Sequence, residues 1–390
     1  MKKKILLLLV VLLIVGVFAF DFFNNLSIVV AGKALPEDYV VLKWGNGDNE
    51  VGIEGPYEDF WYFGPGTFDV DKQGNVYIVD KLNERIIKVD KDGNVVDKID
   101  ISKIVPQEGA YEDPLHASSS ANLLPVQLIA SNNCLFLLHH YRNGTPMPFD
   151  PNEYAYSNYL SIITKDNIVT LDAGKLWGYG ISAYMKRLGD NKIVLTVDVP
   201  PEDIPSWKGP KAVIVDNNGK TSMVNSLING SYDGVTPFAS LLYDEDKETH
   251  CYRNVRVEVK NPKENKVIFT SQLIDNDKLI TFCNLNFNGN KATLMYQDED
   301  AYKYNKEQNT VTTHIAIFTL FPNKEENYTM TVGEEERKDM LPPPFIYKKD
   351  FLLGEDGHFY WMLYMKDGLH IKRFDYEVTT TEYSYRALKF

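Results

Sequence analysis

The chain is poor in cysteine, and this shortage excludes two kinds of stabilising framework. Its 390 residues contain 3 cysteines, Cys134, Cys251 and Cys283, which are too few and too far apart for a disulfide scaffold. None of them has a second cysteine or a histidine at metal-ligand spacing except Cys251, which adjoins His250. Neighbouring side chains of a strand point to opposite faces, so this pair does not predict a metal site.

Positive charge and helical pattern are also scarce. The chain has 41 Lys and Arg against 54 Asp and Glu, a formal net charge of −13. This balance argues against a nucleic-acid backbone as a partner, and it suits the solubility of an exported protein. Helical periodicity is confined to short fragments such as 201–207, which excludes a helical bundle.

One long hydrophobic run stands at the N-terminus. Three lysines precede residues 5–20, ILLLLVVLLIVGVFAF, a pattern typical of a targeting segment. The run spans roughly 24 Å as a helix and residues 22 and 23 extend it, so it serves either as an uncleaved anchor or as a cleaved signal peptide. We expect residues 1–20 to be this hydrophobic helix, 21–36 a membrane-proximal spacer, and 37–390 an extracytoplasmic domain. The protein is then anchored to the membrane by residues 5–23 or secreted after cleavage.

The abundant features are short β-strands and turn residues. The stretch 68–100, FDVDKQGNVYIVDKLNERIIKVDKDGNVVDKID, alternates runs rich in Val, Ile and Tyr with Gly, Asn and Asp. Gly and Asn accept the positive φ of a tight turn, so this pattern predicts four strands in an antiparallel meander. Aromatic residues make up 13% of the chain, which suits sheets that pack through rings.

The same order of strands and turns recurs along the chain. We assign six units, at residues 68–100, 124–173, 183–225, 235–273, 278–332 and 345–386. A single four-stranded sheet cannot bury both faces, so repeated sheets predict an all-β fold, a six-bladed β-propeller of four-stranded blades. Two β-sandwiches are the alternative, although they do not explain one recurring unit. A further strand at 39–44 is expected to pair with the last blade and close the ring.

The first unit resembles an NHL repeat. It contains Gly64-x-Gly66-x-Phe68, then Asp71-x-x-Gly74-Asn75, then Asn83-x-Arg85-Ile86. The last unit keeps Asp356-Gly357 and an apolar strand, whereas the middle units keep only the strand rhythm. The resemblance supports an NHL-like propeller, and such propellers serve as protein-binding, RNA-binding and lyase or lactonase scaffolds.

Several acidic residues of this unit resemble calcium ligands. Asp69, Asp71, Asp90 and Asp92 alternate with other residues, but neither group is followed by the glutamate that an EF-hand loop needs. We interpret them as aspartates that bond the backbone of their own turns. Asp80 and Arg85 are expected to form an ion pair between strands.

Candidate ligand-binding residues lie near one expected rim. His139, His140, Tyr141 and Arg142 close an apolar strand and open a long insertion at 142–158, and Trp177 and Tyr179 follow in a later loop. Consecutive strand residues point to opposite faces, so the two imidazoles do not share a metal. The aromatic residues either stack on a sugar ring or pack between blades.

No motif for nucleophilic catalysis or for phosphate binding is present. We therefore expect an extracytoplasmic binding or scaffold module, monomeric and without a cofactor, that binds a protein or a glycan through loops 142–158, 200–210 and 297–312. The alternative is a secreted lyase or hydrolase that acts on carbohydrate or lactone with a divalent metal in the central channel. In both cases no nucleic acid is expected as a partner.

Overall fold

The computed structural model describes part of the chain. The described residues are 27–57, 61–102, 104, 123–131, 133–146, 154–173, 183–197, 212–224, 233, 236–246, 251–264, 266–272, 279–289, 291–298, 311–320, 324–332, 339–341, 351–377 and 384–386. No helix within these ranges is long and apolar enough to cross a membrane. The expected targeting segment, residues 1–20, lies outside them.

The first blade forms where the turn chemistry predicts it. Its strands are β5 (Phe68–Val70), β6 (Val76–Asp80), β7 (Arg85–Val89) and β8 (Val95–Asp100), which pair in that order in one antiparallel sheet. A short 3-10 helix, η1 (Lys81–Asn83), connects β6 to β7. Gly74 and Gly93 adopt φ of 82° and 83° in the two tight turns, a conformation that side chains with a Cβ rarely adopt.

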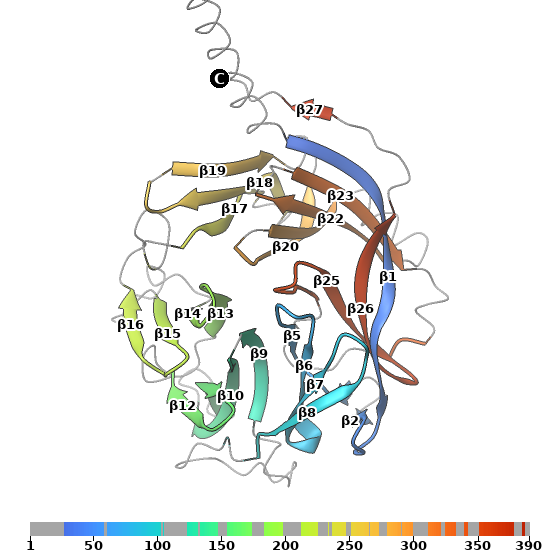
Figure 1. The fold of residues 1–390 in the computed structure, drawn as a ribbon, viewed down its shortest axis with the longest axis vertical. Coiled ribbons are helices and arrows are strands. Elements are labelled where there is room, and N and C mark those ends of the chain that lie inside the picture. Colours follow the sequence, from blue (N-terminus) through green and yellow to red (C-terminus); the bar gives the residue numbers. More distant parts are fainter. Residues whose placement is uncertain are drawn as a thin grey trace, which may run out of the picture.

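Five more blades complete the ring seen in Figure 1, and the six-bladed all-β prediction is confirmed. The fourth to sixth blades are hydrogen-bonded into one continuous sheet, and the described part of the fourth blade has three strands where four were expected. The second and third blades contain β9 (Leu123–Ser131), β10 (Cys134–Pro146), β11 (Tyr154–Ile163), β12 (Ile168–Asp172), β13 (Ala183–Arg187), β14 (Lys192–Val197), β15 (Ala212–Asp216) and β16 (Thr221–Val224). The fourth and fifth contain β17 (Phe238–Asp246), β18 (Cys251–Asn261), β19 (Lys266–Gln272), β20 (Ile280–Phe287), β21 (Lys291–Asp298), β22 (Val311–Thr319) and β23 (Lys324–Val332). The sixth contains β24 (Phe351–Leu353), β25 (Phe359–Met365) and β26 (Gly368–Glu377).

The strand β1 (Ser27–Trp44) closes the ring. Its second half pairs antiparallel with β26, with Val40 opposite Ile371 and Leu42 opposite Leu369, so the expected pairing of residues 39–44 with the last blade is confirmed. Its first half pairs in parallel with β23 and antiparallel with β27 (Ser384–Arg386). The strand therefore begins inside the segment expected to be a spacer, because the edge of the fifth blade offers it unpaired backbone groups.

Two further differences from the expected strands concern residues near the rims. The outer strand of the sixth blade is β1, whereas the C-terminal strand expected there, β27, pairs with the start of β1. In the second blade β10 ends at Pro146 and β11 begins at Tyr154. The pairing of these two strands therefore continues into the insertion that was expected at 142–158. Three short strands, β2 (Glu50–Val51), β3 (Glu54–Tyr57) and β4 (Trp61–Phe63), lie between β1 and the first blade.

The core lies between the blades. Strand β6 shows why, since Val76 and Ile78 pack with residues of the sixth blade while Tyr77 and Val79 pack with residues of the second. Alternate side chains of a strand point to opposite faces, so an apolar run on an inner strand fills two interfaces at once. Further clusters join the second to the third blade, the fourth to the fifth and the fifth to the sixth.

The turns of the first blade use their aspartates as expected. Asp71 accepts hydrogen bonds from the backbone N–H groups of Gln73 and Asn75, each at 2.9 Å. Asp90 accepts them from Asp92 at 3.0 Å and from Asn94 at 2.8 Å. The interpretation of Asp71 and Asp90 as turn residues is confirmed.

The expected ion pair of this blade is also present. Asp80 accepts a hydrogen bond from Arg85 Nε at 3.0 Å and another from the backbone N–H of Gly52 at 2.9 Å. Arg85 Nη2 donates to the carbonyl groups of Gly47 and Glu50 at 2.8 and 2.7 Å. The pair therefore ties the blade to the chain that leaves β1.

Candidate functional site

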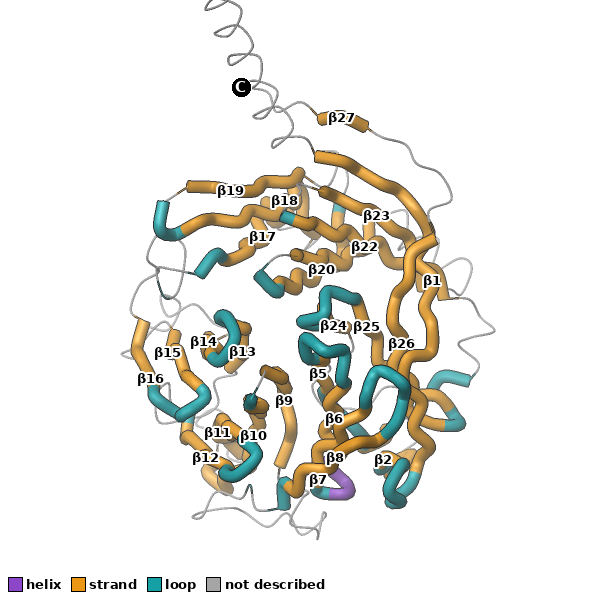
Figure 2. The backbone as a smooth tube through the Cα atoms, viewed as in Figure 1, coloured by secondary structure: helices purple, strands orange, loops and turns teal. Residues whose placement is uncertain are grey.

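A cavity of about 820 Å³ lies at the centre of the ring. The innermost strand of every blade contributes residues to the lining of this cavity. Figure 2 shows how these strands are arranged around the centre of the ring. The lining residues are Asp69, Val126, Gln127, Ile129, Tyr184, Met185, Lys186, Arg187, Ala239, Ser240, Leu241, Tyr243, Leu285, Asn286, Phe287 and Leu353. We call this cavity the central channel.

The inner strands of neighbouring blades run in the same direction. Leu128 and Ala130 of β9 donate backbone hydrogen bonds to Thr67 Oγ1 and Asp69 Oδ2, at 3.1 and 2.7 Å, so β9 advances alongside β5. Asp69, Arg187 and Glu355 each lie within two residues of the carboxyl end of an inner strand. Short turns leave the inner strands at this end of the channel, which we call the short-turn end.

An ionic cluster spans the short-turn end. Arg187 Nη2 donates to Asp69 Oδ2 at 2.7 Å, and Nη1 donates to the carbonyl of Ala130 at 2.8 Å. Nη1 also forms an ion pair with Glu355 Oε1. The side chains of Asp69 and Glu355 are 2% and 6% exposed. One guanidinium from the third blade therefore holds two buried carboxylates from the first and sixth blades.

Glu355 is the member of this cluster whose charged form is least well stabilised. Burial raises the pKa of its carboxyl group, the Arg187 guanidinium lowers it, and the nearby Asp69 carboxylate raises it again. Among the described residues Oε2 of Glu355 has no hydrogen-bond partner. Its backbone N–H donates to the carbonyl of Val70 at 3.1 Å, which fixes the turn that presents the side chain.

Asp69 corrects one expectation. The sequence grouped it with the turn aspartates, but its side chain bonds the second blade and Arg187 of the third blade. Asp69 lies on β5, so its side chain points from the sheet and not into the following turn. No signal in the sequence linked it to Arg187, because 118 residues separate the two.

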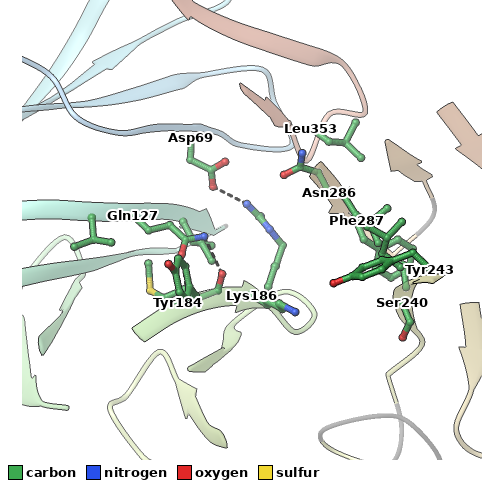
Figure 3. A pocket seen from close by; sticks show the side chains of 16 residues that line it. Asp69, Gln127, Tyr184, Lys186, Ser240, Tyr243, Asn286, Phe287 and Leu353 are labelled. Carbon is green, nitrogen blue, oxygen red and sulfur yellow. Dashed lines mark hydrogen bonds and ion pairs between the residues drawn. The ribbon is translucent and has the colours of Figure 1, made fainter. Parts of the chain in front are cut away.

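The walls of the channel carry aromatic and polar side chains, as Figure 3 shows. Gln127 is fixed by two hydrogen bonds to the backbone of Met185, at 2.8 Å through Nε2 and 2.7 Å through Oε1. Tyr184 and Tyr243 lie on opposite sides of the cavity in this view and are 39% and 46% exposed. Lys186 lines the same cavity, where desolvation by the surrounding atoms lowers its pKa below the usual value.

Of the candidates from the sequence, His139 is described in full and lies inside the second blade. It is buried on β10, one strand away from the channel, where its Nε2 lies 3.0 Å from Ser161 Oγ and its ring stacks on Tyr159 at 5.8 Å. The backbone of His140, Tyr141 and Arg142 continues β10, while their side chains are outside the description. Trp177 and Tyr179 lie outside the described residues.

The described residues do not fit a divalent metal. Within these ranges no three His, Cys, Asp or Glu side chains are grouped so that they hold an ion. The described carboxylate of the channel wall, Asp69, already pairs with Arg187 and accepts a backbone hydrogen bond. Of the cysteines, Cys134 is a free, buried thiol whose pKa is raised to about 11 by burial, as expected of a small apolar core residue.

Comparisons with known proteins return similar folds and no family. Neither the scan of family models nor the search of curated proteins finds a match. Among solved structures, a streptogramin B lyase is 12% identical, covering 83% of this chain and 97% of its own, at a TM-score of 0.33. A member of the DUF4221 family from Bacteroides vulgatus is 9% identical, and the match covers 89% of this chain and 99% of that protein at a TM-score of 0.39. The virginiamycin B lyase from Staphylococcus aureus is 11% identical, and the match covers 80% of this chain and 94% of that protein at a TM-score of 0.32. Likenesses at these scores carry no argument about function.

Proposed function

We propose that this chain is an extracytoplasmic binding module, held to the membrane by its N-terminal segment, whose ligand occupies the central channel. The observation that carries the proposal is the channel itself, about 820 Å³ in volume and lined by all six blades. Ligand pockets have this size and this mixture of apolar walls with a few polar groups. Rigid inner strands hold the lining side chains, so the pocket is largely formed before a ligand arrives.

The ionic cluster supports entry from the opposite end. Arg187 connects the third blade with the first and sixth at the short-turn end, so we infer that a ligand enters from the other end. At the other end of the channel lie the carboxyl ends of β10, β14 and β21 and the amino ends of β11, β15 and β22, with which they pair. The connections 147–153, 198–211 and 299–310 leave the blades there, within or close to the three loops expected to form the recognition surface.

The carboxylate of the channel wall is not available for catalysis. General acid–base catalysis needs a titratable group that can exchange a proton with the substrate. Among the described lining residues the carboxylate of Asp69 is committed to Arg187 and to Ala130. A lyase or hydrolase with a divalent metal is the alternative, and stoichiometric metal in the purified chain would favour it.

A blocked channel tests the proposal. Ser240→Trp places a large ring among the lining residues, whereas Val96→Trp adds the same bulk on the outer β8, where Val96 is 52% exposed. We expect compounds from a library of saccharides and peptides to raise the melting temperature of the wild-type chain and of Val96→Trp but not of Ser240→Trp. Equal stabilisation of all three chains would place the ligand outside the channel.

A further inference from the structure

The charged side chains of the central channel are already engaged within the protein. Among the described lining residues these are Asp69, Lys186 and Arg187. Arg187 donates to Asp69 Oδ2 at 2.7 Å and also pairs with Glu355, and Lys186 has an interaction partner of its own. A charged ligand group would lose its water here and would compete with these partners for a counter-ion, which is costly. The described wall therefore favours an uncharged ligand.

The fourth and fifth blades give the channel an aromatic wall. Tyr243 of β17 and Phe287 of β20 line the cavity there, together with leucines of the same strands (Figure 3). Tyr243 is 46% exposed although it lies inside the ring of blades. Its ring packs against Tyr252 with centroids 4.5 Å apart, which holds it in place. A fixed ring that is open to the cavity is a stacking surface for the flat face of a ligand.

Two short polar side chains accompany these rings. Ser240 of β17 and Asn286 of β20 line the same cavity (Figure 3). An amide group donates two hydrogen bonds and accepts at its oxygen, and a hydroxyl group both donates and accepts. A neutral sugar presents hydroxyl groups at the edge of its ring and an apolar C–H surface on its face. The polar groups of the wall match the first of these features, and the aromatic rings match the second.

Backbone groups at the inner edges of the second and third blades are already bonded. A peptide that binds as an added strand needs free backbone groups at a strand edge. On β9 the N–H groups of Leu128 and Ala130 donate to side chains of the first blade. On β13 both backbone groups of Met185 bond the side-chain amide of Gln127. These contacts favour a saccharide over an extended peptide.

On the basis of the proposed function, we infer that the ligand is an uncharged saccharide. One sugar ring stacks on Tyr243, and its hydroxyl groups bind Ser240 and Asn286. Phe287 extends the apolar surface for the neighbouring sugar unit. The ion pair of Asp69 and Arg187 keeps its own partners in this arrangement.

Matched neutral and acidic sugars test the inference. Galactotriose and mannotriose are titrated into the full purified chain by calorimetry at pH 6.5, with linkage-matched trigalacturonate and trimannuronate as acidic counterparts. We expect at least one neutral trisaccharide to bind, and its uronate to bind at least about tenfold more weakly because its carboxylates lose water without gaining a counter-ion. A uronate that binds as tightly as its neutral counterpart, or more tightly, overturns the inference.

The net charge of the chain provides an alternative explanation that salt separates. A charge of −13 repels anions over a Debye length of about 8 Å in physiological salt, which shortens to about 3 Å at about 1 M. Desolvation inside the channel does not depend on this screening. The preference for the neutral sugar is therefore expected to persist in about 1 M sodium chloride, and its disappearance there contradicts the inference.

Variants of the channel wall supply a further readout. We expect Tyr243→Ala to weaken binding of the neutral sugar about tenfold, whereas Tyr243→Phe keeps the ring face and the affinity. Asn286→Asp also weakens binding, because a carboxylate replaces the two amide donors. Met223→Ala, at a 65% exposed position on the outermost strand of the third blade, keeps the wild-type affinity.

The outcomes separate this inference from the proposed function. Unchanged affinity in a folded Tyr243→Ala chain overturns the inference, and Asn286→Asp decides in its place if that variant does not fold. Absence of binding by every trisaccharide overturns it too. The comparison of Ser240→Trp with Val96→Trp, in which peptides are also screened, then decides the proposed function by itself.

Discussion

At the residue scale, Arg187 holds together three blades that lie far apart in the sequence. It is 13% exposed and contacts two carboxylates that are almost fully buried. Removing one partner of a buried ion pair leaves uncompensated charge and typically costs about 3–5 kcal/mol. We expect Arg187→Met to lower the free energy of unfolding by about this amount, measured by urea unfolding at pH 7.

An exposed pair nearby is the control for this prediction. Lys72 and Asp190 also join the first and third blades, but their side chains are 40% and 61% exposed. Exposed pairs contribute about 0–1 kcal/mol because solvent screens them. Lys72→Met therefore has little effect, and an equal loss in both variants would show that the cluster is not a structural bridge.

Glu355 makes the stability of the folded chain depend on pH. Burial raises its pKa from 4.5 in spite of Arg187, so the folded chain keeps this proton to a higher pH than the unfolded chain. Its contribution to stability is full below pH 4.5 and is lost as the pH rises through the folded-state pKa. We expect Glu355→Gln, which resembles the protonated form, to be more stable than the wild type at pH 7.5.

The difference should disappear toward pH 4 as the wild-type carboxyl group takes up its proton. Urea unfolding from pH 4 to 8 measures it, with Glu264→Gln at an exposed position as the control. A Glu355→Gln chain that is less stable than the wild type at pH 7.5 would mean that the ion pair with Arg187 outweighs desolvation.

At the scale of elements, β1 is the strand that completes the sixth blade. Val40 and Leu42 point into the core between the sixth and first blades and are 1% and 2% exposed, while Val41 points outward and is 47% exposed. Truncating a buried leucine to alanine costs about 2–5 kcal/mol, and an exposed substitution about 0.5 or less. We expect Leu42→Ala to destabilise the chain by the larger amount and Val41→Ala by the smaller.

Hydrogen exchange locates this loss. Leu42→Ala should accelerate exchange in β24–β26, whose outer edge β1 covers, before it affects β14 and β15. Uniformly faster hydrogen exchange across all blades would show that the ring unfolds as a unit and that β1 does not stabilise the sixth blade separately.

At the scale of the whole molecule, the interfaces between blades are unequal. Within the described ranges, hydrophobic clusters span five of the six boundaries, whereas the small cluster of Val194, Ala212 and Val224 stays within the third blade. Less buried apolar area gives a lower local free energy of opening. We expect β16 and β17 to exchange their amide hydrogens sooner than β6 and β10 in native-state measurements. Equal protection at all four strands would contradict this.

Much of the architecture followed from local chemistry. The strands of the first blade match the expected segments because Gly74 and Gly93 permit tight turns and Asp71 and Asp90 bond their backbone. Such interactions join residues only a few positions apart, so a single stretch of sequence contains both partners. The pairing of residues 39–44 with the last blade was also predictable, because a ring needs a closing strand.

The central channel was not predictable in the same way. The sequence drew attention to His139, which lies inside a sheet, and gave no sign that Lys186, Tyr243 and Asn286 line one cavity. Each comes from a different blade, and a strand pattern shows which side chains alternate without showing which of them face the axis.

The sequence by itself determined the repeated four-stranded unit, the turns that separate its strands and the need to stack such units. Only the tertiary structure decided that Arg187 meets Asp69 and Glu355, that β1 joins two blades and that the inner strands enclose a channel. The physical reason is distance along the chain. Turn and strand preferences act over a few residues, whereas these contacts form between segments that come together only when the ring closes.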